Sequence, residues 1–169
     1  MEEILIVDGY NVIHAWPELT ARGASLEEAR MSLIDALSNY RGSKGNRIIV
    51  VFDAHSAKGF RDREENVQGI LVIYSAEGQT ADSVIEGLVS TYIPQGRVYV
   101  VTSDWEQQRV VFGRGAYRLS ARELIHLVKA TQTDQRELME EQRGQRGFLS
   151  NRLSPELQAQ LEKMRRGKG

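Results

Sequence analysis

The chain has 169 residues, which is enough for one α/β domain with a short extension and for a core that needs no covalent staples. Because it contains no cysteine, disulfides and thiolate metal sites are excluded, and any metal ion must be held by oxygen or imidazole ligands. The net charge of −1 gives no overall preference for nucleic acid, and the lack of a signal peptide and of any bilayer-spanning apolar run predicts a soluble cytoplasmic protein with no membrane partner.

Strand-like and helical patterns alternate along the chain. The first half of the chain predicts a strand at Ile4–Val7, a helix at Leu26–Tyr40 and strands at Ile48–Phe52 and Ile70–Tyr74. A helix at Thr80–Tyr92, a strand at Val98–Val101, a short helix from Ser103 and a strand near Ala116–Leu119 follow. The chain then predicts a long helix from Ser120 toward Glu141, a loop at Arg143–Asn151 and a last helix from Ser154. The strand-like runs are apolar and rich in β-branched residues, as in parallel strands buried on both faces. The expected N-caps are Ser25, Thr80, Ser103 and Ser120. We therefore expect an α/β fold, a three-layer α/β/α sandwich with a mainly parallel sheet.

Two stretches are basic although the whole chain is nearly neutral. Between residues 41 and 63 six bases stand against two acids, and between residues 142 and 169 seven bases stand against two acids. Solvated surface explains each stretch by itself, and phosphate binding is the functional alternative. The first stretch overlaps residues 54–69, which lack periodicity, and so long a connection inside a domain is usually functional. We expect the domain to cover residues 1–141, followed by a basic C-terminal loop, short helix and tail over residues 142–169.

Acidic residues follow the predicted strands at the points where ligands bind in open α/β sheets. Asp8 ends the first strand, Asp53 ends the second, and Asp104 follows the fourth by a Thr-Ser step. Asp82 lies in the first turn of the helix at Thr80–Tyr92, and Glu86 follows one turn later. Carboxylates that converge repel one another unless a hard cation lies between them, and Mg²⁺ or Mn²⁺ prefers such oxygen ligands. Ions held in this way activate water for attack on a phosphodiester.

Each acid also has a structural explanation. Asp8 with Gly9 forms a good turn pair, Asp53 can simply end a strand, and Asp82 and Asp104 can stabilise helix N-termini. We favour a metal site because four such positions coincide at one end of the predicted sheet. Glu86 is a weaker candidate, which would contact a metal ion through water.

Residues beside these acids are candidates for binding substrate. They are Tyr10, Asn11, His55, Lys58, Arg61, Arg63, Thr102 and Ser103. Tyr10 can stack on a base or pack in the core, and Asn11 can orient Asp8, bind a phosphate or cap a turn. Thr102 and Ser103 can donate to phosphate oxygens, while His55 follows Asp53 closely enough to meet the substrate. The three bases of the loop would hold phosphates electrostatically.

Four motifs in this order resemble the YacP-like NYN domain, a branch of the PIN-like nuclease superfamily. They are Val7-Asp8-Gly9-Tyr10-Asn11, Val51-Phe52-Asp53-Ala54, Thr80-Ala81-Asp82-Ser83-Val84-Ile85-Glu86 and Thr102-Ser103-Asp104. Each motif is weak by itself, whereas the ordered set is fairly specific. The resemblance covers roughly Ile4 to Val128, which is most of the chain.

The resemblance implies a PIN-like fold with strand order 3-2-1-4-5 and a metal-dependent endoribonuclease. Asp8, Asp82 and Asp104 would form the acidic core with Asp53 beside them, and either Asp53, Glu86 or neither would complete it. It further implies cleavage of single-stranded messenger RNA in the A site of the translating ribosome, leaving a 5′-phosphate and a 3′-hydroxyl. The segment 54–69 and the basic tail would then contact ribosomal RNA.

Two other classes remain as alternatives. A haloacid-dehalogenase-type phosphatase would need a second aspartate two residues after Asp8, where this chain has Tyr10. A non-catalytic RNA- or ribosome-binding module would keep the fold without the chemistry, and the complete set of acids argues against it. The sequence contains neither a GxGxxG turn nor a Walker A loop, which disfavours nucleotide-cofactor enzymes. The oligomeric state is not predicted.

Overall fold

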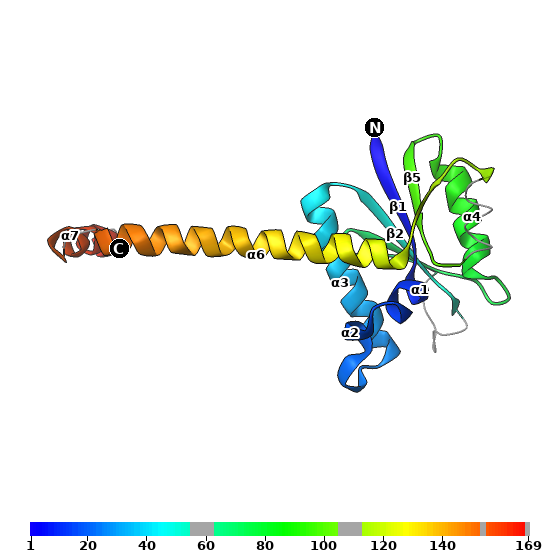
Figure 1. The fold of residues 1–169 in the computed structure, drawn as a ribbon, viewed down its shortest axis with the longest axis horizontal. Coiled ribbons are helices and arrows are strands. Elements are labelled where there is room, and N and C mark those ends of the chain that lie inside the picture. Colours follow the sequence, from blue (N-terminus) through cyan, green and yellow to red (C-terminus); the bar gives the residue numbers. More distant parts are fainter. Residues whose placement is uncertain (55–62, 105–112, 153–154, 168–169) are drawn as a thin grey trace. The chain divides into compact units, whose positions relative to one another are not determined.

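Six strands form one sheet in the order β3-β4-β2-β1-β5-β6 in the computed structural model. Figure 1 labels β1, β2 and β5 of this sheet. The structure describes residues 1–54, 63–104, 113–152 and 155–167. The strands are β1 (Glu2–Asp8), β2 (Arg47–Phe52), β3 (Glu64–Val67), β4 (Ile70–Tyr74), β5 (Gly96–Val101) and β6 (Tyr117–Leu119). All neighbours pair in parallel except β3, which is antiparallel to β4.

The five predicted strands lie in the order that the family resemblance implies, and β3 is an additional edge strand. Sequence patterns missed β3 because its residues are mostly exposed and form no apolar run. A two-residue turn creates it: Gln68 and Gly69 have φ angles of 53° and 82°, as a hairpin of the primed type requires. The side-chain amide of Gln68 donates to Asp35 Oδ1 at 2.6 Å, and the backbone carbonyl of Gln68 accepts from Ser38 Oγ at 2.8 Å. Both bonds anchor the turn to the helix α3 (Leu26–Lys44).

The helices are α1 (Gly9–His14), α2 (Pro17–Thr20), the 3₁₀ turn η1 (Ala21–Gly23), α3 (Leu26–Lys44), α4 (Ala81–Tyr92), α6 (Ala121–Arg152) and α7 (Pro155–Arg166). The predicted caps of three helices are confirmed, because the hydroxyls of Ser25, Thr80 and Ser120 accept from Glu28 N, Ser83 N and Glu123 N at 3.1 to 3.2 Å. The helix predicted from Ser103 would run through residues 105–112, outside the described residues.

The predicted loop at residues 143–151 was wrong, because α6 continues through this segment to Arg152. Each glycine costs a helix about 1 kcal/mol, and Gly144 and Gly147 stand among glutamine and arginine residues that favour helix. The chain divides into two compact units, Met1–Lys129 and Ala130–Gly169. No helix among the described residues combines the length and apolar character needed to cross a membrane.

The sheet of the first unit buries side chains on both faces, which confirms the sandwich. One face packs against α1, α3 and the start of α6 through residues such as Val7, Leu37 and Leu124, which are fully buried. The other face packs against α4 through Ile6, Ile49, Ile85 and others. Burial on both sides explains why the central strands are apolar at every position rather than at every second one.

Candidate active site

The parallel sheet brings the ends of distant segments to one rim. Val7 of β1 pairs with Val101 of β5, and Asp8 pairs with Val51 of β2, so the carboxyl ends of these three strands are adjacent. Asp8 is the last residue of β1, Asp53 follows β2, and Asp104 follows β5 after two further residues. Because β1 and β5 are neighbours in the sheet, the segments that carry Asp8 and Asp104 leave it at adjacent positions.

The electrostatics of Asp8 show that four carboxylates share this rim. The pKa of Asp8 is raised from 3.8 to about 6, chiefly because burial penalises the charged form. The backbone amide of Asn11 opposes this change, while the charges of Asp82, Asp104 and Asp53 add to it. The four aspartates that the sequence singled out therefore lie close enough for the charges of three of them to act on Asp8. Among the described residues, Glu86 is not one of the groups that raise this pKa.

The arrangement is open and does not form a closed metal cage. Within the part of the chain that the structure describes, no three acidic or histidine side chains converge closely enough to hold one ion together. Magnesium sites commonly use only one or two carboxylates, and water and phosphate oxygens fill the other positions. The donor chemistry of the aspartates suits a site of that open type.

Two side chains predicted to bind substrate support the loop that carries Asp104. The Oδ1 atom of Asn11 accepts from Ser103 N at 2.9 Å, which joins the segment after β1 to the segment after β5. Asp104 N donates to Thr102 Oγ1 at 3.1 Å, and Thr102 is fully buried. The side chain of Ser103 stays exposed on the same loop. Asn11 and Thr102 therefore position the loop that carries Asp104. The sequence suggested a positioning role for Asn11 but not for Thr102.

Tyr10 is partly buried and packs against the core beside the acids. Its ring centroid lies 5.0 Å from that of Phe52, and its hydroxyl accepts from Arg30 Nη1 at 2.9 Å. These contacts favour the packing interpretation of Tyr10 over base stacking. Gly9 is also required for packing, because a Cβ atom there would lie 2.3 Å from the Phe52 ring. Phe52 thus fixes the backbone beside Asp8 and immediately precedes Asp53.

Sequence reasoning missed two supporting residues, Arg30 and Ser75. Arg30 is only 4% exposed, and a signal existed because it lies three and four residues before Leu33 and Ile34, on the apolar stripe of α3. Ser75 N donates to Phe52 O at 3.0 Å, and its hydroxyl accepts from Ala54 N at 2.9 Å. Ser75 therefore holds the chain on both sides of Asp53, and nothing in the sequence pattern indicated this.

One of the loop bases predicted to hold phosphates can be placed. Arg63 precedes β3, which runs antiparallel to β4, so it lies near the carboxyl end of β4. It is exposed, and its Nη2 atom donates to Gln79 Oε1 at 3.2 Å just before α4. His55, Lys58 and Arg61 lie outside the described residues.

Known proteins resemble this chain over almost its whole length. The family model described as "YacP-like NYN domain" matches residues 5–166 of this chain. The uncharacterized protein YacP of Bacillus subtilis (strain 168) is 40% identical over 167 residues, which cover 98% of both chains.

Solved structures agree with the sequence comparison. The crystal structure of Rae1 (YacP) from Bacillus subtilis superposes with a TM-score of 0.73 at 40% identity, covering 98% of this chain and 95% of the other. A single-residue mutant of the same protein superposes with a TM-score of 0.66 at 36% identity and covers 98% of this chain and 96% of the other. The fold, the aspartates at one rim of the sheet and the extent of these matches lead to one assignment. The chain belongs to the YacP-like NYN domain family, a nuclease-type family.

Proposed function

We propose that the chain is a divalent-metal-dependent endoribonuclease that cleaves single-stranded messenger RNA in association with the translating ribosome. The observation that carries the proposal is the meeting of Asp8, Asp82, Asp104 and Asp53 at one rim, where their mutual repulsion helps raise the pKa of Asp8 to about 6. A divalent cation would relieve this repulsion by replacing a proton with two positive charges. Membership of a nuclease-type family supports RNA cleavage as the reaction.

Asp8, Asp82 and Asp104 are the proposed ligands of Mg²⁺ or Mn²⁺, directly or through water, with Asp53 or Glu86 as a supporting acid. The bound ion would lower the pKa of a water molecule and offset charge on the phosphodiester. Asn11 and Thr102 keep Asp104 in place through their hydrogen bonds. Arg63 is exposed beside Gln79 and offers positive charge to the RNA phosphates. Cleavage would leave a 5′-phosphate and a 3′-hydroxyl.

The ribosomal setting, with cleavage in the A site, is part of the same proposal and places the protein in the cytoplasm. The basic end of the chain supports it, because Lys163, Arg165 and Arg166 lie in the last turn of α7 and are exposed. Exposed bases that neutralise nucleic-acid phosphates release counterions, and this release favours binding. Ribosomal RNA carries phosphates that these bases would bind.

Mapping of RNA 5′ ends tests both parts of the proposal. Purified protein is supplied with translating ribosomes and with Mn²⁺, Mg²⁺ or EDTA, and Asp82→Asn is compared with wild type. Asp134→Asn is the matched control, since Asp134 is an exposed aspartate on α6 in the second unit. We expect metal-dependent cuts in phase with codons for wild type and the control, and none for Asp82→Asn. Cuts without phase would contradict the ribosomal setting, and intact RNA with every metal would contradict the nuclease.

A further inference from the structure

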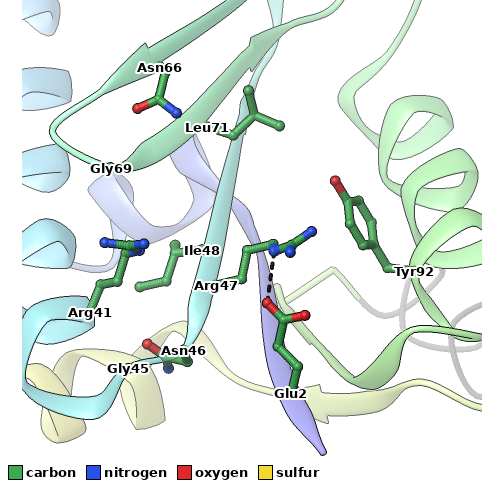
Figure 2. A pocket seen from close by; sticks show the side chains of 10 residues that line it. All are labelled: Glu2, Arg41, Gly45, Asn46, Arg47, Ile48, Asn66, Gly69, Leu71 and Tyr92. Carbon is green, nitrogen blue, oxygen red and sulfur yellow. Dashed lines mark ion pairs between the residues drawn. The ribbon is translucent and has the colours of Figure 1, made fainter.

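A polar cavity of about 320 Å³ opens at the opposite end of the sheet from the aspartates. It is lined by residues at the amino ends of β1 and β2, by the end of α3, by the turn between β3 and β4 and by α4 (Figure 2). Glu2 borders the cavity and stands six residues before Asp8 on β1, a separation of about 20 Å along an extended strand. The cavity is therefore separate from the candidate active site.

Asn46 gives this cavity an unsatisfied hydrogen-bond acceptor. The residue is only 6% exposed, and among the described residues its Oδ1 atom has no hydrogen-bond partner. Buried polar atoms in folded proteins almost always have one. Asn46 lines the cavity directly, and Figure 2 shows it near Arg41 and Ile48. A bound molecule that donates a hydrogen bond would satisfy this atom.

Two arginines of the cavity differ in how their charge is compensated. Arg47 Nε lies 2.9 Å from Glu2 Oε1, and its guanidinium carbon stands 5.6 Å from the centroid of the Tyr92 ring. Arg41 has no acidic partner within the described residues, and its Nη1 atom lies 2.8 Å from the point where a Cβ on Gly69 would stand. The uncompensated positive charge of the cavity therefore belongs to Arg41.

The position of Arg41 has a structural explanation that covers only part of this arrangement. Arg41 lies in the last turn of α3, where a cation interacts favourably with the negative end of the helix dipole. That interaction accounts for a base at this position. It does not account for the buried acceptor of Asn46 or for the open volume between the two side chains.

We propose that this cavity binds a small phosphate ester that carries hydroxyl groups, with its phosphate on Arg41 and a hydroxyl donating to Asn46 Oδ1. A guanidinium binds phosphate oxygens through two parallel N–H donors, which a single water molecule would use less fully. Ligand cavities range from about 300 to 1,000 Å³, so a cavity at the lower end of that range suits a sugar phosphate or a mononucleotide. The site binds and does not cleave, since the aspartates lie at the other end of the strands.

Isothermal titration calorimetry of the full chain tests the proposal with ribose 5-phosphate, adenosine monophosphate and inorganic phosphate, all without divalent metal. We expect ribose 5-phosphate to bind about tenfold more tightly than inorganic phosphate, and Arg41→Gln to weaken it by at least about tenfold. Lys44→Gln is the matched control, because Lys44 lies in the same last turn and does not line the cavity. Competition by a 5′-phosphorylated oligoribonucleotide would identify an RNA end as the source of the ester.

Three results would overturn the proposal: no saturable binding at millimolar ribose 5-phosphate, equal affinity for inorganic phosphate, or unchanged affinity in Arg41→Gln. Asn46→Asp adds a second measurement, since a carboxylate there should repel the phosphate, and circular dichroism checks that the variant folds. RNA cleavage by Arg41→Gln should equal that of wild type. A failure of this proposal is therefore distinguishable from a failure of the proposed nuclease activity.

Discussion

The two ends of the same sheet carry opposite kinds of electrostatics. At the carboxyl ends of the strands, burial and the charges of Asp82, Asp104 and Asp53 raise the pKa of Asp8 to about 6. At the amino ends, acids of β1 are paired: Glu2 lies 2.9 Å from Arg47 and Glu3 lies 3.6 Å from Arg97. Paired surface charges are stabilising or neutral, whereas like charges at one rim destabilise the fold. Acids of one strand therefore have like-charged neighbours at one end and oppositely charged neighbours at the other.

Neutralising one acid at each end of β1 should have very different effects on RNA cleavage. Asp8→Asn should reduce RNA cleavage at least a thousandfold, equivalent to about 4 kcal/mol of transition-state stabilisation, if Asp8 holds the metal ion. Glu3→Gln should leave the rate within about twofold, since Glu3 is exposed and far from the rim. Single-turnover cleavage rates measure both. Equal rates for Asp8→Asn and wild type would remove Asp8 from the site.

The pH dependence of stability should differ between the same two variants. The folded protein keeps the Asp8 proton up to about pH 6, whereas the unfolded chain loses it near 3.8, so the free energy of unfolding should fall as the pH rises between these values. The contribution of Asp8 is up to about 3 kcal/mol, is complete below the lower pKa and is lost above the upper one. Asp8→Asn should lack this decline and be more stable than wild type at pH 7 in EDTA. Urea unfolding at several pH values measures the difference, with Glu3→Gln retaining the decline.

Divalent metal should offset most of the stability that the wild type loses at pH 7. Mn²⁺ at a hundred times its dissociation constant should stabilise the wild type by about 2.7 kcal/mol, because an ion that binds only the folded state shifts unfolding by mass action. The shift should be absent in Asp82→Asn and present in Asp134→Asn. Thermal unfolding with and without Mn²⁺ measures it. A wild-type chain that Mn²⁺ leaves unchanged would favour the non-catalytic RNA-binding module.

Alanine substitutions at two glycines, one at the packed rim and one on an exposed helix surface, should change the stability in opposite directions. Gly9→Ala should destabilise the fold by about 1 to 3 kcal/mol, because the new methyl group would overlap the Phe52 ring. Gly42→Ala should stabilise it by about 0.5 to 1 kcal/mol, since open space surrounds Gly42 within α3. Chemical denaturation measures both changes. A Gly9→Ala variant of unchanged stability would show that Phe52 can move aside.

The smallest effect is expected at the paired end of the sheet. Glu2→Gln should cost less than about 1 kcal/mol, because the ion pair with Arg47 is partly exposed and screened by water. The loss should shrink further in high salt, which screens exposed charges. Urea unfolding at two salt concentrations measures this, and a loss above that range would mean that the pair organises the cavity beside it.

Local patterns predicted the parts of the site that depend on residue type and strand ends. Asp8, Asp53 and Asp104 follow buried apolar runs, and parallel strands bring such positions to one rim regardless of the residues between them. Supporting contacts were less accessible to prediction, since Asn11 and Ser103 are 92 positions apart in sequence and meet only through the pairing of β1 with β5. Arg30 of α3 contacts Tyr10, and Ser75 after β4 contacts Phe52, through other tertiary contacts that the local sequence does not indicate.

Local sequence patterns predicted β1, β2, β4, β5 and β6, the helices α3, α4 and α7 and the start of α6, and the carboxylates at strand ends, because apolar periodicity and capping are local properties. Tertiary structure decided the rest. It converted Gln68 and Gly69 into the turn that adds β3, and it carried α6 past two glycines. It also raised the pKa of Asp8, because burial and the charges of distant residues act through space and not along the chain.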